Sequence, residues 1–198
     1  MENVHTNSMN KINKDVDSPI KKILYEYINK NESYLKKLIV KNNEFIVTKI
    51  INHCYDSIIN INENTCENVG NFIESMLHYL FTMYAIPTQR KITSRDIYID
   101  IVIPNIQELI NNPKNSLLIY IPKTKSINEI KNNLRSLNKL QLMSSNIWLI
   151  SDEIFHHDFT QYSIKINNSF TNPIIHLLKN VQKFIKNQNY NTFKIINS

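Results

Sequence analysis

Two acidic residues of this sequence lie inside segments that are otherwise apolar. Asp100 is in the middle of the run IYIDIVIP, and Glu74 is within the run NFIESMLHYLF. A buried carboxylate is unfavourable unless it is paired or has a chemical role. One hypothesis pairs Asp100 with Arg90 or Arg95 and leaves Glu74 as an exposed residue near His78. The alternative hypothesis makes both acids parts of a functional site.

Basic residues recur every four positions at Lys131, Arg135 and Lys139, and Lys123 and Lys125 come shortly before them. This spacing places the three on one face of a helix. Such a row can contact the phosphates of DNA or RNA, which makes binding sensitive to salt. The alternative is a solvated helix face, and the net charge of +6 fits either hypothesis. Exposed aromatic residues do not alternate with these charges, so we expect no platform for stacking single-stranded bases.

The cysteine and histidine residues do not indicate a metal site. Cys54 and Cys66 form no CxxC pair and have no histidine pair at zinc-finger spacing. We expect both to be buried or half-buried in a reducing compartment. His156 and His157 follow two acids in SDEIFHHDF, but their spacing does not bring the side chains to one face of a helix or strand. We expect a loop with solvated side chains there.

The single glycine, Gly70, excludes several classes of protein. Phosphate-binding loops, dinucleotide-binding fingerprints and nucleophile elbows each need several glycines. Residues 1–14 are polar and contain no apolar stretch of the kind found in a signal peptide. The longest apolar runs are far shorter than the about 20 residues that span a bilayer. We therefore expect a cytoplasmic protein without a membrane segment.

The periodicity of apolar residues predicts the elements that hold these side chains. Residues 1–17 are expected to be a disordered tail. Helical spacing predicts a helix that starts at Pro19 and further helices over 32–41, 44–60, 69–84, 126–141 and 173–187. Runs of β-branched and apolar residues predict strands over 89–93, 97–104, 117–121, 146–150 and 162–166, with a turn of helix over 106–110.

The order of these elements predicts an α/β (α+β) fold. The strand–helix–strand passage over 117–150 implies a parallel pair with a right-handed crossover, and the short links between the earlier strands imply antiparallel pairs. The result is a mixed central sheet flanked by helices on both faces. An N-terminal helical segment, 18–68, is expected to pack on an α/β core formed by 69–190.

This order, with Glu74 on a helix and Asp100 on the second strand, resembles the core of the PD-(D/E)xK nuclease superfamily, which includes restriction endonuclease-like and Holliday-junction resolvase-like enzymes. The resemblance covers about residues 69–150. In that superfamily two acids, joined by a third acid two residues before a lysine, hold one or two Mg²⁺ ions that activate water. The resemblance implies that Glu74 and Asp100 would hold the metal and that Lys123 would position or deprotonate the water. Mg²⁺ is the cofactor if the protein is active.

The third strand, SLLIYIPKTK, departs from the pattern of that superfamily. Tyr120 stands where the acid is expected, Pro122 stands where the lysine is expected, and Lys123 is one position late. Because side chains alternate along a strand, Lys123 should point to the wrong face unless Pro122 introduces a bulge. The loss of an anionic ligand weakens a site for a hard cation. We therefore expect a degenerate active site.

The leading hypothesis is a nucleic-acid-associated protein with weak or no nuclease activity, which contacts DNA or RNA through the five basic residues from Lys123 to Lys139. One alternative is a non-enzymatic interaction or assembly protein that retains the scaffold. Another is an active Mg²⁺-dependent endonuclease whose missing acid comes from elsewhere in the chain. Homodimers are common in the resembled superfamily, so a homodimer is a further expectation. The composition also resembles that of small proteins from thermoacidophilic archaea, but no sequence motif accompanies this resemblance.

Overall fold

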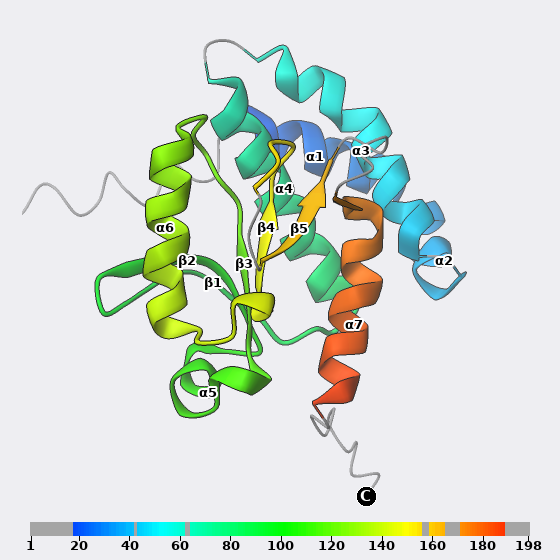
Figure 1. Ribbon diagram of the computed structural model, residues 1–198. Helices are drawn as coiled ribbons and strands as arrows, with labels where there is room; N and C mark the ends of the chain where they lie inside the picture. The colour runs from blue at the N-terminus through cyan, green and yellow to red at the C-terminus, as the bar shows by residue number, and fades with distance from the viewer. Residues whose placement is uncertain (1–17, 42, 62–63, 156–158, 165–170, 189–198) are drawn as a thin grey trace, which may run out of the picture.

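Figure 1 shows the computed structural model, in which helices cover a mixed β-sheet. The structure describes residues 18–41, 43–61, 64–155, 159–164 and 171–188. The expected tail, 1–17, and the residues His156 and His157 lie outside these ranges. Within these ranges, no helix is long and apolar enough to cross a membrane.

The helices and strands follow the expected order. The helices are α1 (Pro19–Lys30), α2 (Glu32–Lys41), α3 (Asn43–Ile59), α4 (Thr65–Met83), α5 (Ile106–Asn111), α6 (Ile127–Leu140) and α7 (Leu177–Asn187). The strands are β1 (Gln89–Ser94), β2 (Ile97–Ile103), β3 (Leu117–Tyr120), β4 (Ile147–Ile150), β5 (Thr160–Ser163) and β6 (Asn172–Pro173).

Several boundaries differ from the sequence-based prediction, and strand β5 begins two residues earlier than expected. Helix α4 begins at Thr65 rather than at residue 69, so Gly70 lies inside the helix. Thr65 and Glu67 of its first turn are exposed, and polar residues on an exposed turn leave no apolar periodicity to detect. Helix α7 begins later than expected because the two-residue strand β6 and a 3-10 turn precede it.

The six strands found in the described residues form one sheet in the order β1-β2-β3-β4-β5-β6. The pairs β1–β2 and β2–β3 are antiparallel, and the pairs β3–β4, β4–β5 and β5–β6 are parallel. Helix α6 connects the parallel strands β3 and β4, as the passage over 117–150 predicts. The mixed sheet flanked by helices is therefore confirmed.

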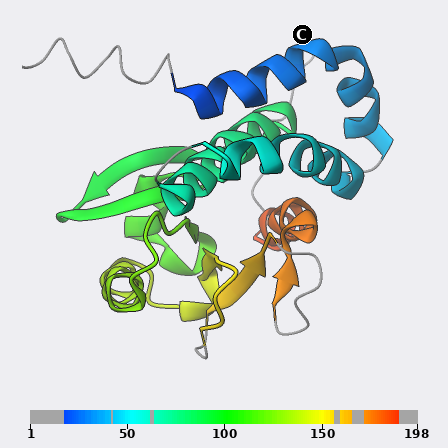
Figure 2. The same cartoon turned by 90° about the horizontal axis from the view of Figure 1, so that it is seen from above.

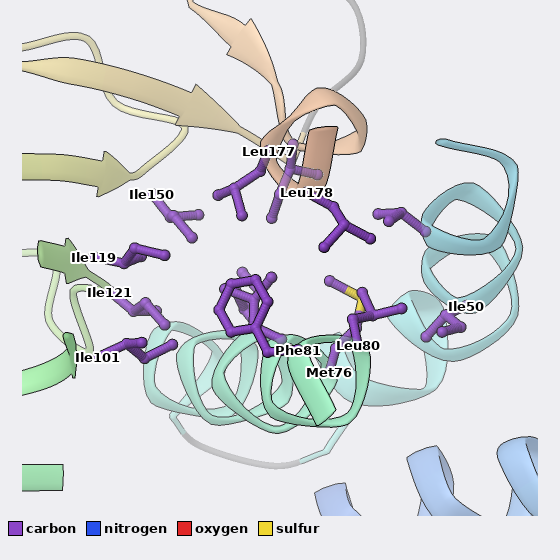
Figure 3. Packing of buried hydrophobic residues seen from close by; sticks show 14 of the residues in the cluster. Ile50, Met76, Leu80, Phe81, Ile101, Ile119, Ile121, Ile150, Leu177 and Leu178 are labelled. Carbon is purple, nitrogen blue, oxygen red and sulfur yellow. The ribbon is translucent and has the colours of Figure 1, made fainter. Parts of the chain in front are cut away.

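Two apolar clusters fill the space on the two faces of the sheet. The α4 cluster joins the sheet to α1, α2, α3, α4 and α7. Figure 3 shows Phe81 of α4 between Ile119 of β3 and Leu177 of α7. The α6 cluster joins the other face to α5 and α6. Figure 2 shows α6 on the opposite side of the sheet from α4. The first three helices share the α4 cluster with the sheet, whereas the boundary between segments 18–68 and 69–190 stays a prediction.

Candidate functional site

In the β1–β2 hairpin, the alternation of side chains between the two faces of the sheet is interrupted at the same level in both strands. Ile92 and Ile99 are paired and belong to the α6 cluster. Ile101 lies two residues beyond Ile99 and would share its face in a regular strand, yet it belongs to the α4 cluster. On the facing strand β1, Lys91 lies between the partners of Ile101 and Ile99. Its φ is 52°, in the left-handed region that residues other than glycine rarely adopt. The alternation of side chains is therefore broken beside Asp100.

This break turns two consecutive residues of β1 toward helix α4. Neighbours in a strand normally point to opposite faces. Here Nη1 of Arg90 lies 3.7 Å from Oε1 of Glu74, and Nζ of Lys91 lies 3.6 Å from the same oxygen. The hairpin thus directs two cationic groups at one carboxylate of α4.

Asp100 is held on β2 by a backbone donor and a lysine. Its side chain is 4% exposed, and Oδ2 accepts a hydrogen bond of 2.9 Å from the N–H of Ile121. Oδ1 lies 3.7 Å from Nζ of Lys123. Burial raises the pKa of Asp100 to about 6, although the Ile121 N–H and Lys123 oppose this shift. The hypothesis of an Asp100–arginine pair is wrong, since Arg90 pairs with Glu74 instead.

Glu74 is buried on α4, so the hypothesis that places it on the surface is also wrong. It is 1% exposed, and its Oε2 accepts a hydrogen bond of 2.8 Å from Nζ of Lys123. Its Oε1 is buried and accepts no hydrogen bond from the described part of the chain. Glu74, Asp100 and Lys123 therefore form one group, which we call the acid–lysine cluster.

Lys123 reaches both acids, contrary to the expectation that it faces away from them. Strand β3 ends at Tyr120, so the alternation rule does not apply three residues later. Burial lowers the pKa of Lys123, but the hydrogen bond and charge of Glu74 and the charge of Asp100 outweigh this and raise the pKa. The ammonium group therefore stays charged between the two carboxylates.

The only glycine of the chain lies where helix α4 meets the segment that carries Lys123. Gly70 is one turn before Glu74 on α4. A Cβ atom at this position would lie 2.9 Å from Cγ of Lys123 and 3.1 Å from the backbone oxygen of Pro122. Gly70 therefore allows the chain after β3 to approach the helix closely. The only sign of this role in the sequence is a lone glycine four residues before Glu74.

Tyr120 does not join the acid–lysine cluster. Its ring belongs to the α6 cluster, and its hydroxyl oxygen accepts a hydrogen bond of 2.9 Å from Nδ2 of Asn133 on α6. Burial raises the pKa of Tyr120 to about 12, so the phenol is neutral. Position 120, where the superfamily has an acid, thus adds no third carboxylate beside Glu74 and Asp100.

Glu74 and Asp100 fit a divalent cation as two of its ligands. They offer the hard oxygen donors that Mg²⁺ prefers, and among the described residues no donor makes a hydrogen bond to the buried Oε1 of Glu74. In the described ranges no group of three or more His, Cys, Asp or Glu side chains could hold a metal ion. Mg²⁺ is often held by one or two carboxylates with water and substrate phosphates, so this pair suits a weakly held ion.

Three of the five predicted basic residues lie on α6. Of the five, only Lys123 contacts Glu74 and Asp100. Lys125, Arg135 and Lys139 are exposed and Lys131 is half-buried. The opposite side of α6 buries four apolar residues in the α6 cluster: Ile130, Leu134, Leu137 and Leu140. The predicted start of the helix is confirmed, because Oγ of Ser126 accepts a hydrogen bond from the N–H of Glu129.

The structure adds Tyr98 as an exposed aromatic residue near the acid–lysine cluster. Tyr98 lies on β2 two residues before Asp100, and it is 51% exposed. Partial burial raises the pKa of Tyr98, and the charges of Lys123, Asp100, Glu74 and Arg90 act on it. The sequence does not single out Tyr98, because a tyrosine in an apolar run is typical of a strand.

The other residues considered for metal binding have structural roles. Asp152 accepts hydrogen bonds from Oγ of Ser163 and from the N–H of Ile164. Cys54 is buried and Cys66 is half-buried, and both are free thiols. The predicted burial of the cysteines is confirmed, and the reducing compartment stays a prediction.

Comparisons with known proteins add evidence on the fold. No protein-family model and no curated protein sequence matches the chain. The restriction endonuclease PspGI, solved with substrate DNA, is similar with a TM-score of 0.61 and 11% identity, over 86% of this chain and 94% of that chain. Metal-depleted Ecl18kI, solved with uncleaved DNA, is similar with a TM-score of 0.50 and 15% identity, over 88% of this chain and 68% of that chain. Neither similarity bears on the archaeal resemblance.

At these identities the similarity concerns the fold alone. It covers 86% of this chain. Glu74 of α4, Asp100 of β2 and Lys123 after β3 meet within this fold. The protein has a restriction endonuclease-like fold.

Proposed function

We propose that the protein binds double-stranded DNA on this fold and cleaves it weakly or not at all. The observation that carries the proposal is the acid–lysine cluster, in which Nζ of Lys123 lies 2.8 Å from Glu74 and 3.7 Å from Asp100. Three residues from a helix, a strand and a loop meet in one place. Such convergence of titratable groups is typical of a functional site.

Two observations favour a nucleic acid as the partner, and the first of them favours DNA. PspGI and Ecl18kI were both solved as complexes with DNA. The net charge of this chain is +6, and a positive surface attracts the phosphates of nucleic acids. We propose that Lys123 contacts a phosphate next to the acids and that four further basic residues extend the contact: Lys125, Lys131, Arg135 and Lys139.

The small number of carboxylates is the reason to propose weak cleavage. When bound, Mg²⁺ would supply activation of water and neutralisation of charge on the phosphate. Glu74 and Asp100 would hold it, but the ammonium of Lys123 already contacts both carboxylates. Tyr120, at the expected position of a third acid, is a neutral residue of the α6 cluster. A site with few anionic ligands and a competing cation favours low metal occupancy.

Binding of a labelled DNA duplex, measured by fluorescence anisotropy over a series of salt concentrations, tests the proposal. We expect binding that weakens linearly on a log–log plot of affinity against salt. An absence of binding at low salt would contradict it and would favour the alternative of a non-enzymatic assembly protein. RNA of the same sequence, used as a competitor, distinguishes the two nucleic acids.

An active Mg²⁺-dependent endonuclease is the second candidate. The observation in its favour is Oε1 of Glu74, which is buried and accepts no hydrogen bond among the described residues. Incubation of plasmid DNA with Mg²⁺ or Mn²⁺ tests it. Strong cleavage that is lost in Asp100→Asn, and retained in the exposed control Asp56→Asn, would establish this candidate over weak activity.

The proposal extends to the setting of the protein. We propose that it acts in the cytoplasm and forms a homodimer, by the resemblance to a superfamily in which dimers are common. Light scattering coupled to gel filtration measures the mass in solution. A monomer at the concentration that saturates DNA would contradict the homodimer.

A further inference from the structure

The β1–β2 hairpin projects from the rest of the sheet, as Figures 1 and 2 show. Strand β1 is at the outer edge of the sheet. The hairpin closes with the two residues Arg95 and Asp96, which both have positive φ, as the tight turn of a twisted hairpin requires. The hairpin therefore forms a defined protrusion beside the acid–lysine cluster.

Arg90 stands on this hairpin next to the acid–lysine cluster. Its side chain is 31% exposed, and Nη1 is 3.7 Å from Oε1 of Glu74. This separation is longer than a hydrogen bond. A guanidinium group has five N–H donors, and Arg90 makes no side-chain hydrogen bond within the described residues. Its donors suit the oxygens of a phosphate, which guanidinium binds in a two-pronged geometry.

Tyr98 supplies an aromatic surface on the other strand of the hairpin. With half of its surface exposed, its ring is available to a ligand that lies along the hairpin. Aromatic rings pack on bases and sugars with little dependence on sequence. A cation and an aromatic ring on one protrusion match the two chemical parts of a nucleotide.

The backbone conformation of Lys91 explains why the side chain of Arg90 points toward Glu74. In a regular strand Arg90 and Lys91 would point to opposite faces. The left-handed backbone of Lys91 instead lets both reach Glu74. Backbone strain of this kind is characteristic of functional sites, and here its effect is to keep Arg90 beside the acids.

From these observations we infer that the β1–β2 hairpin is a contact surface for the nucleic-acid backbone, in which Arg90 binds a phosphate and Tyr98 packs on the adjoining sugar or base. The inference rests on the proposed function and deepens it. It assigns the hairpin to the binding surface together with Lys123, whereas the sequence alone pointed to the row of basic residues on α6.

Duplex binding by charge-matched variants tests the role of Arg90. We expect Arg90→Gln to weaken binding about fivefold or more and to lower the slope of log affinity against log salt by about one. Lys183→Gln is the control, since it removes the same charge from the exposed face of α7, which Figure 2 shows away from the hairpin. Arg90→Lys should keep the salt slope and lose only part of the affinity.

A pair of substitutions at Tyr98 separates the ring from the hydroxyl. We expect Tyr98→Phe to bind as the wild type does and Tyr98→Ala to bind about fivefold more weakly. Tyr34→Ala is the control, because Tyr34 is exposed to a similar degree on α2. Circular dichroism and thermal unfolding check that each variant is folded.

The possible outcomes separate this inference from the proposed function. Binding by the wild type with unchanged affinity in Arg90→Gln and Tyr98→Ala would overturn the inference and leave the proposed function standing. An absence of binding by the wild type would overturn both. Losses in these two variants that the controls do not share would support the hairpin as the contact surface.

Discussion

Nζ of Lys123 donates a hydrogen bond of 2.8 Å to Oε2 of Glu74 across a separation of 49 residues. The same nitrogen lies 3.7 Å from Oδ1 of Asp100. One ammonium group therefore lies between two buried carboxylates from different elements, and Arg90 and Lys91 add positive charge beside Glu74. The same contact offsets the cost of burying both acids.

Replacement of Lys123 should destabilise the protein strongly near neutral pH. Lys123→Met leaves Glu74 and Asp100 buried without their shared cation, and breaking a buried pair in this way costs about 3–5 kcal/mol. Urea unfolding at pH 7 measures the loss. The exposed neighbour Lys125 provides the control, because Lys125→Met should change the free energy of unfolding by less than about 0.5 kcal/mol. Equal effects of the two substitutions would contradict the importance of the contact.

The pH dependence of stability should carry the signature of Asp100. Burial raises its pKa from the ordinary value of 3.8 to about 6, so the folded state binds this proton more tightly than the unfolded state does. Between about pH 4 and pH 6 this group lowers the free energy of unfolding as the pH rises, by up to about 1.4 kcal/mol per pH unit.

The contribution of Asp100 can be isolated by a difference measurement. Asp100→Asn keeps an oxygen that can accept the hydrogen bond from Ile121 but does not titrate. The difference in free energy of unfolding between wild type and Asp100→Asn should therefore shift in favour of Asp100→Asn as the pH rises from 4 to 6. A difference that is constant over this window would contradict the raised pKa.

Gly70→Ala should destabilise the protein, although alanine is favoured over glycine in a helix by about 1 kcal/mol. The added Cβ would lie 2.9 Å from Cγ of Lys123 and 3.1 Å from the backbone oxygen of Pro122. Overpacking of this kind costs about 1–3 kcal/mol, which outweighs the helical gain. Urea unfolding provides the measurement, with Asn71→Ala on the same helix as a control that should be neutral or stabilising. A more stable Gly70→Ala would show that the chain after β3 can move away.

The sequence predicts most of the fold because the apolar periodicity of each element matches its burial. The crossover over 117–150 is one example, since the short apolar strands and the capped helix between them have few other arrangements. Asp100 was likewise predictable as a charge that needs a partner. Its partner Lys123 was not predictable from the alternation of side chains, because β3 ends at Tyr120 and the alternation does not extend to Lys123. The roles of Gly70 and Tyr98 depend on contacts between distant segments, which no local pattern records.

Divalent cations should bind weakly to the free protein and more tightly when DNA is present. Glu74 and Asp100 already contact Lys123, so a cation must compete with an ammonium group, whereas a bound phosphate would supply further oxygen ligands. Isothermal titration with Mn²⁺, with and without a duplex, measures the change. Asp100→Asn should abolish the gain. Tight binding to the free protein would contradict the two-carboxylate site.

A carboxylate at position 120 should not create a metal site, although the resembled superfamily has an acid at the corresponding position. Tyr120 packs in the α6 cluster and its hydroxyl oxygen accepts a hydrogen bond from Asn133. Tyr120→Asp would place a charge in apolar surroundings, so we expect a loss of stability without a gain in Mn²⁺ affinity. Tyr120→Phe removes only the hydrogen bond and should cost about 1 kcal/mol. A gain of Mn²⁺ affinity or of cleavage in Tyr120→Asp would show instead that this side chain can turn toward Glu74 and Asp100.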